Sequence, residues 1–110
     1  MDIQSLSRHC NEVLILSALS SGARHGYQLA LEIEQKSQGT FRFKHGTLYP
    51  ILHRLEKEGL IQGDWVEEKS KRKRKSYRLT RAGRQHLQVQ KRAWRDFFDC
   101  FFNVIGEAER

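Results

Sequence analysis

The sequence predicts a mainly α-helical α+β domain with one two-stranded hairpin and a long last helix. Three observations carry this prediction. Apolar residues recur at helical spacing in three segments of the first half of the chain. The spacing then alternates in two short segments on either side of a basic stretch, which is typical of a hairpin. Helical spacing returns near the end of the chain, where aromatic residues are frequent.

The first two helices are predicted over residues 10–19 and 25–36. Residues 10–19 are rich in aliphatic side chains, and Gly22 follows them at a position suited to a left-handed helix end. In residues 25–36, Leu29 and Ile33 are spaced to face inward. These segments therefore predict two packed helices joined by a short turn.

A third helix is predicted over residues 46–58. Pro50 lacks an amide hydrogen and is tolerated only near the start of a helix, so the helix is expected to begin close to Gly46. Gly59 is expected to end it. One face is apolar because four residues follow the spacing i, i+3, i+4 and i+7: Leu48, Ile51, Leu52 and Leu55.

Two strands are predicted over residues 61–67 and 76–79, and the basic stretch between them is expected to form the tip of the hairpin. The faces follow from the alternation, with Ile61, Trp65 and Glu67 on one side of the first strand and Tyr77 and Leu79 sharing a side of the second. Thr80 is suited to cap the helix that follows, predicted over residues 81–105.

The positive charge is concentrated in one short segment. The chain has 110 residues, with 20 Lys and Arg against 13 Asp and Glu. Residues 69–75 read KSKRKRK and hold six of the basic residues, so the remaining 14 nearly balance the acidic ones. No equally dense acidic run exists to neutralise these cations. We therefore expect an anionic partner, with nucleic acid favoured over a membrane surface.

The sequence does not support an enzyme, a metal site or a cofactor. Cys10 and Cys100 are far apart and belong to no Cys/His cluster. The five histidines show no ligand spacing with carboxylates, and no Gly-rich phosphate loop follows a predicted strand. The start of the sequence lacks the pattern of a signal peptide, and no apolar run is long enough to span a membrane. We expect a cytoplasmic protein with two free thiols.

Three segments together resemble PadR-type transcriptional regulators. They read HGYQLALEIE at residues 25–34, GTLYPILHRLEKEGLI at 46–61 and YRLTRAG at 77–83. The GTLYP start of the third helix and the LEKEGLI run that follows are the specific parts. The similarity covers roughly residues 10–105, and the single long last helix resembles the shorter branch of the family.

The resemblance implies a winged helix-turn-helix architecture in two parts. Residues 1–80 would form the DNA-binding head, with a recognition helix at about 46–58 and a wing at about 60–80. Residues 81–110 would form a C-terminal dimerisation helix. The implied function is repression of transcription by a dimer that binds double-stranded DNA.

The recognition helix and the loop before it hold the first candidate contacts. A major groove admits one helix, and the N-terminal residues of that helix reach the base edges first. Helical spacing turns a second face away from the apolar one, and in isolation an ordinary solvated face would be the better explanation; the neighbouring wing and the family resemblance favour DNA contact. We predict DNA contacts from Thr47, Tyr49, Pro50, His53 and Arg54, and from Lys44 and His45 in the loop.

The other candidate contacts lie at the second helix and the wing. Tyr27 is placed where a helix N-terminus can approach a phosphate, although packing of this ring into the core is an equal alternative. Arg72, Lys73 and Arg74 are expected to contact phosphates or the minor groove. The alternative for these three is a solvated loop.

The last helix carries an aromatic stripe that predicts dimerisation. The segment FFDCFF at residues 97–102 is too apolar to be left in water, and a small head has little surface to cover it. A membrane-lying helix and an intramolecular core helix are the alternatives. The predicted interface residues are Leu87, Trp94, Phe97, Phe98, Phe101 and Ile105.

Trp94 and Phe98 are also candidates to hold a small aromatic effector, because aromatic faces stack on flat ligands. Packing of Trp94 in a dimer core is an equally good explanation. The sequence as a whole predicts a dimeric repressor on a roughly palindromic operator. The alternative is a winged-helix module that binds another protein without sequence-specific DNA binding.

Overall fold

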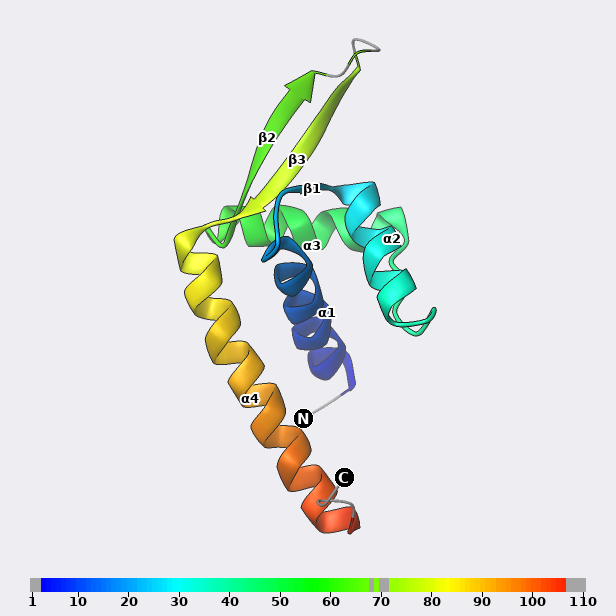
Figure 1. Cartoon of the computed structure of the whole chain (residues 1–110), viewed down its shortest axis with the longest axis vertical. Coiled ribbons are helices and arrows are strands. Elements are labelled where there is room, and N and C mark those ends of the chain that lie inside the picture. The colour runs from blue at the N-terminus through cyan, green and yellow to red at the C-terminus, as the bar shows by residue number, and fades with distance from the viewer. Residues whose placement is uncertain (1–2, 68, 70–71, 107–110) are drawn as a thin grey trace.

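The computed structural model describes residues 3–67, 69 and 72–106, which form four helices and a three-stranded sheet (Figure 1). The helices are α1 (Ile3–Leu19), α2 (Gly26–Lys36), α3 (His45–Lys57) and α4 (Arg81–Ile105). The strands are β1 (Arg24–His25), β2 (Ile61–Glu67) and β3 (Lys73–Leu79). The predicted α+β class is confirmed, with a hairpin after three helices and a long last helix.

The strand β1 was not predicted. It lies antiparallel to β3, with Arg24 opposite Tyr77 and His25 opposite Ser76, so the sheet has the order β1-β3-β2. Two residues are too few to show an alternating pattern in the sequence. This strand exists because β3 supplies its partner, and it ties the turn before α2 to the base of the hairpin.

Two elements are longer than the sequence predicted. Helix α1 begins at Ile3 instead of at residue 10. Strand β3 begins at Lys73 instead of at residue 76, because residues 73–75 pair across the hairpin with residues 65–67 of β2. Half of the basic run therefore belongs to a strand and not to the tip of the hairpin.

The core lies where the three head helices meet the base of the hairpin. Leu48, Leu52 and Leu55 of α3 are buried, as the apolar stripe predicted, and Ile51 packs at the edge of the cluster. The other buried apolar residues are Ile15, Leu16, Leu19, Leu29, Ile33, Ile61, Tyr77, Leu79 and Leu87.

The junction between the hairpin and α4 is tightly packed. The Thr80 hydroxyl accepts a hydrogen bond from Gly83 N–H at 3.0 Å, which confirms the predicted N-cap. A Cβ on residue 83 would overlap the Leu60 carbonyl oxygen and crowd Leu79. The direction in which α4 leaves the head therefore depends on a glycine at this position.

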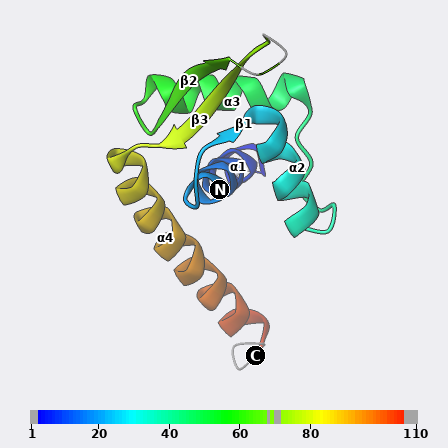
Figure 2. The same ribbon diagram turned by 45° about the horizontal axis from the view of Figure 1, so that its top comes forward.

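The molecule is elongated because α4 extends beyond the head. Its principal extents are 56, 29 and 25 Å. Helix α1 of the head packs against the N-terminal part of α4. The C-terminal part of α4 continues past the other helices (Figures 1 and 2). The hairpin projects from the opposite end of the head, beyond α3 (Figure 1).

Candidate nucleic-acid interface

The solvent-facing side of α3 carries most of the predicted contact residues. The helix buries its leucines against the head, so the residues between them face outward. His45 and Tyr49 are one turn apart, and their rings stack with a centroid distance of 5.7 Å and an interplanar angle of 8°. The structure exposes six predicted residues on and just before this helix: Lys44, His45, Thr47, Tyr49, Pro50 and His53.

The N-terminus of α2 lies beside this face of α3. Gly26 is buried, and a Cβ at this position would approach the Tyr49 hydroxyl to 2.8 Å. A glycine is therefore needed for this close contact between the two helices. Tyr27, the next residue, is 62% exposed, which excludes the alternative that its ring packs into the core. Tyr27 and Tyr49 both line the same hollow of the head.

The wing, which we define as residues 61–79, completes a concave surface with these helices. Its register pairs Trp65 with Lys75 and Glu67 with Lys73. Arg72, Lys73 and Arg74 are exposed, while Lys71 lies outside the described residues. A hollow of about 640 Å³ separates the wing from the helices and is lined by His25, Gly26, Tyr27, Tyr49, Trp65, Lys73, Arg74, Lys75 and Tyr77.

Trp65 is a member of this surface that the sequence reasoning did not select. The alternating pattern placed it on the same strand face as Ile61, which is buried. Trp65 is 68% exposed because the hairpin projects past the end of the head, so the same face is covered at its base and open further along. Its position beside a run of cations was the available signal.

Lys75 differs from the other cations of the wing. Its Nζ donates a 2.8 Å hydrogen bond to Glu56 Oε1 of α3. This bond lowers the pKa of the Glu56 carboxyl and raises the pKa of Lys75, so both groups stay charged over a wide pH range. The expectation that no cation of the basic run is neutralised within the chain is therefore wrong for Lys75.

Arg54 also differs from its prediction. Its side chain is only 35% exposed, and its Nη1 atom lies 3.6 Å from Glu12 Oε2 and 3.5 Å from Glu58 Oε2. Glu12 is buried, and its other oxygen lies 2.8 Å from His86 Nε2 of α4. The expected outward orientation of Arg54 is corrected, because this residue joins α3 to α1 and α4.

The C-terminal part of α4 presents an aromatic face, which we define as Trp94, Phe97, Phe98, Phe101, Phe102 and Ile105. Its rings contact one another along the helix, and Trp94 stacks on Phe98 at 5.7 Å. Phe97, Phe98, Phe101 and Ile105 remain 41–50% exposed in the single chain. Leu87 is only 1% exposed because it packs in the core of the head, which corrects its assignment to the dimer interface.

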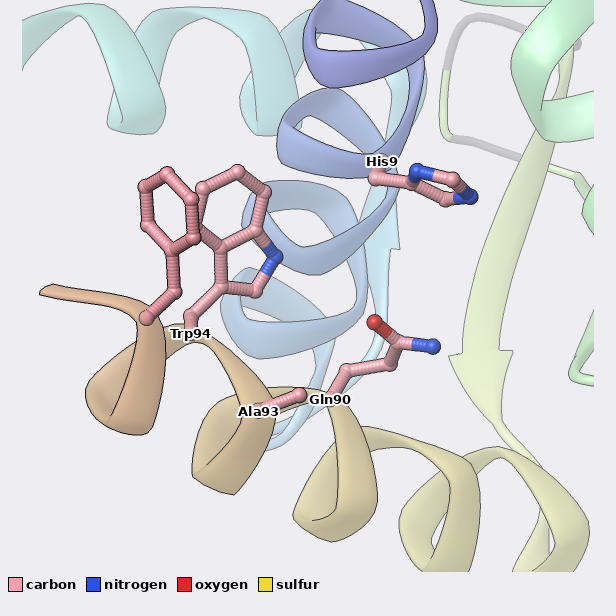
Figure 3. A pocket seen from close by; sticks show the side chains of 5 residues that line it. His9, Gln90, Ala93 and Trp94 are labelled. Atoms are coloured by element: carbon pink, nitrogen blue, oxygen red, sulfur yellow. The ribbon is translucent and has the colours of Figure 1, made fainter. Parts of the chain in front are cut away.

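A cavity of about 300 Å³ lies between α1 and the start of the aromatic face. His9 extends toward it from α1, while Gln90, Ala93 and Trp94 line it from α4 (Figure 3). Phe97 completes the lining, whereas Phe98, the predicted partner of Trp94 in holding an effector, stacks on the tryptophan instead. His9, Gln90 and Ala93 were not selected from the sequence, and His9 was missed because α1 was expected to begin after it.

The described part of the chain shows no group of three or more His, Cys, Asp or Glu residues that could hold a metal ion. Burial raises the pKa of the Cys10 thiol, which disfavours its reactive thiolate form. Among residues 3–67, 69 and 72–106, no helix has the length and apolar character needed to cross a bilayer.

Comparison with known proteins places this geometry in a family. Residues 15–89 match the transcriptional regulator PadR-like family. Transcriptional regulator Rv3488 of Mycobacterium tuberculosis is 39% identical over 79 residues, which cover 72% of this chain and 70% of the relative.

Two solved structures are similar in fold. The PadR family transcriptional regulator of Eggerthella lenta has a TM-score of 0.79 and 29% identity, over 94% of this chain and 88% of the other. Bacillus subtilis PadR in complex with operator DNA has a TM-score of 0.66 and 29% identity, over 72% of this chain and 45% of that one.

Proposed function

The chain belongs to the PadR-like family of transcriptional regulators, and we propose that it is a homodimeric repressor that binds a specific DNA operator. One observation carries the proposal: Tyr49 on the exposed face of α3 and the wing cations Lys73, Arg74 and Lys75 line the same hollow. The similarity to Bacillus subtilis PadR, whose structure contains operator DNA, supports this assignment. Members of the family are regulators and not enzymes, and the chain acts in the cytoplasm, where its operator lies.

In this proposal α3 enters the major groove and recognises the base sequence of the operator. Thr47 and His53 offer hydrogen-bonding groups on its exposed face, and Pro50 offers an apolar surface that suits a thymine methyl group. The stack between His45 and Tyr49 holds both rings in place before DNA arrives. We leave Arg54 out of the contact set, because Glu12 and Glu58 hold its guanidinium.

The DNA backbone follows the hollow between the helices and the wing. Arg72, Lys73 and Arg74 lie on one side of its path and Tyr27 and Lys44 on the other, all of them exposed. Cations supply sequence-independent affinity when they displace counterions from phosphates, while a tyrosine hydroxyl donates one further hydrogen bond. In this proposal the wing thus provides affinity and α3 provides sequence specificity.

The aromatic face of α4 pairs two heads. A second copy of this chain is the occupant that we propose for it, because the same face on both copies is self-complementary about a two-fold axis. Residues 1–80 then act as the head and 81–110 as the dimerisation segment, of which residues 107–110 lie outside the described part. Two heads related by this axis match a roughly palindromic operator with half-sites about one DNA turn apart.

The cavity beside Trp94 is the proposed site of a small aromatic effector. It joins α1 of the head to α4, so a flat ligand that stacks on the indole changes the packing between these two helices. A change in that packing alters the separation of the two heads and hence the fit to the operator. Repression would then respond to the ligand.

Salt dependence of DNA binding tests the proposal. Duplexes from the upstream intergenic region are titrated by fluorescence anisotropy between 50 and 200 mM salt. Arg72, Lys73 and Arg74 are changed together to Ala, with Arg92 and Arg95 of α4, both exposed and distant in sequence from the wing, changed to Ala as the control. If each wing cation neutralises one phosphate, the dimer loses six contacts, and the slope of log affinity against log salt becomes shallower by about 5.

The control variant is expected to keep the wild-type slope. A protein-interaction module would bind the duplexes weakly or not at all at low salt, and its wing variant would behave as the control does. That outcome would replace the repressor with the alternative function. Loss of transcription from the bound promoter when the wild-type protein is added distinguishes a repressor from an activator.

A further inference from the structure

A single carboxylate connects α3 to both strands of the wing. Glu56 Oε1 accepts a hydrogen bond from Lys75 Nζ of β3 at 2.8 Å, and Glu56 Oε2 accepts one from the Gly63 N–H of β2 at 3.1 Å. The side chains of Glu56 and Lys75 are each 28% exposed, so water screens the pair only in part. The hairpin cannot tilt away from α3 without losing one of these bonds.

The residue at position 63 leaves the room that this connection needs. A Cβ built on Gly63 would overlap Lys75 Cε and would lie 3.1 Å from Glu56 Oε2. Any side chain at this position would therefore require the end of the Lys75 side chain to shift. The lysine is also held by rings, because its Nζ lies 5.9 Å from the ring centroid of Trp65 and 5.5 Å from that of Tyr77.

Lys73 provides the contrast within the same strand. It is two residues from Lys75 and therefore on the same face of β3, but it is exposed and makes no ion pair with a described residue. Two lysines of one wing thus have different environments. One is available to a phosphate, and the other is committed to α3.

We propose that Glu56 and Lys75 are positioning residues that fix the wing relative to α3, and that Lys75 does not serve as a phosphate contact. The expected effect of this pair on DNA affinity rests on the proposed function. Its role in holding the wing against α3 does not depend on that function. The pair fixes the separation of the wing and α3 beside the hollow that the DNA backbone would occupy, since Lys75 lines that hollow and is bonded to Glu56 of α3.

The test compares Lys75→Met with Lys73→Met in the full chain. Methionine keeps the length and apolar stem of lysine and removes the charge, so the two variants differ only in position. Lys73→Met is expected to make the salt slope of a dimer shallower by about 2, the value for two lost phosphate contacts. Lys75→Met is expected to keep the wild-type slope and to weaken binding about fivefold at every salt concentration, as loss of a partly screened ion pair allows.

Two measurements without DNA report the geometry itself. Amide hydrogen exchange at Gly63 is expected to accelerate in Lys75→Met and not in Lys73→Met, because Glu56 loses the partner that holds it in place. Emission of Trp65, recorded in a Trp94→Phe background to remove the other tryptophan, is expected to change only in Lys75→Met. Lys75→Arg keeps a donor for Glu56. It is expected to show the wild-type rate of amide exchange at Gly63 and the wild-type DNA affinity.

Two results would overturn the inference. One is a salt slope for Lys75→Met that falls as much as that of Lys73→Met, because Lys75 would then be a phosphate contact. The other is unchanged Gly63 exchange and Trp65 emission in Lys75→Met, because the pair would then not hold the wing. If the wild-type chain binds no duplex, the proposed function fails, while the exchange and emission data still decide whether the pair positions the wing.

Discussion

Replacing Phe98 and Phe101 by Glu should convert the protein to monomers. These side chains are 45% and 47% exposed in the single chain. A buried phenylalanine covers about 200 Å², so each ring leaves about 90 Å² of apolar surface for a second copy to cover. At about 25 cal/mol per Å², each ring contributes about 2 kcal/mol.

A two-fold dimer contains four of these rings, so the double substitution removes about 8 kcal/mol and raises the dissociation constant of the dimer about a millionfold. Sedimentation equilibrium measures the result directly against the chain mass of 13.0 kDa. The wild type is expected at twice this mass and the variant at the single-chain mass.

A matched control lies on the same helix. Val89 is 67% exposed, and helical spacing places it away from the aromatic face. Val89→Glu adds one negative charge per chain to α4, half of that in the double variant, and is expected to remain dimeric. If the phenylalanine variant stays dimeric, or if Val89→Glu dissociates equally, the aromatic face is not the interface and the reasoning fails.

Three further predictions concern the effector cavity, the wing pair and the start of α4. A planar aromatic ligand should quench Trp94 emission saturably in a Trp65→Phe background, and linear quenching alone would argue against the site. Titration calorimetry, which needs no tryptophan, should show that Trp94→Ala weakens the binding about tenfold, as loss of one aromatic stack allows. Since the pKa of Glu56 is lowered by folding, its contribution to stability is present above about pH 4.5 and is lost as the pH falls below that value. Denaturant titrations should therefore show a smaller acid-side loss of unfolding free energy for Glu56→Gln than for the wild type, and equal losses would contradict the assignment. Gly83→Ala should lower the free energy of unfolding by about 1–3 kcal/mol, because its Cβ overlaps the Leu60 carbonyl, and an unchanged thermal midpoint would show that the junction can relax.

Local signals in the sequence predicted most of the fold. The stripe on α3 follows helical spacing, and Leu48, Leu52 and Leu55 are buried as expected. The cap at Thr80 needs only a hydroxyl before a helix, and it forms as predicted. These features depend on residues a few positions apart, which is why the sequence alone reveals them.

Features that depend on distant partners were missed. Strand β1 has two residues and exists only by pairing with β3. The bond between Glu56 and Lys75 joins residues 19 positions apart. The sequence alone gives no sign that Lys75 differs from the other cations of the basic run. Arg54 looks like an outward cation on a helical wheel, yet Glu12 of α1 and Glu58 at the C-cap of α3 form ion pairs with it.

The last helix has one feature that local spacing predicted and one that depends on a distant partner. Its aromatic stripe was correctly located, but Leu87 continues the same register into the head and is covered by the chain itself. Helical spacing shows which residues share a face and does not show how far a neighbouring helix covers that face. Helix α1, which begins earlier than expected, accounts for part of this cover.

A footprint on the DNA upstream of the gene tests the central claim most directly. A dimer whose two α3 helices enter successive major grooves should protect two inverted half-sites with centres about 10 base pairs apart, with the wings extending protection to the flanking backbone. A Phe98→Glu/Phe101→Glu double variant should lose that paired pattern. Protection without inverted symmetry, or no protection at low salt, would contradict the account.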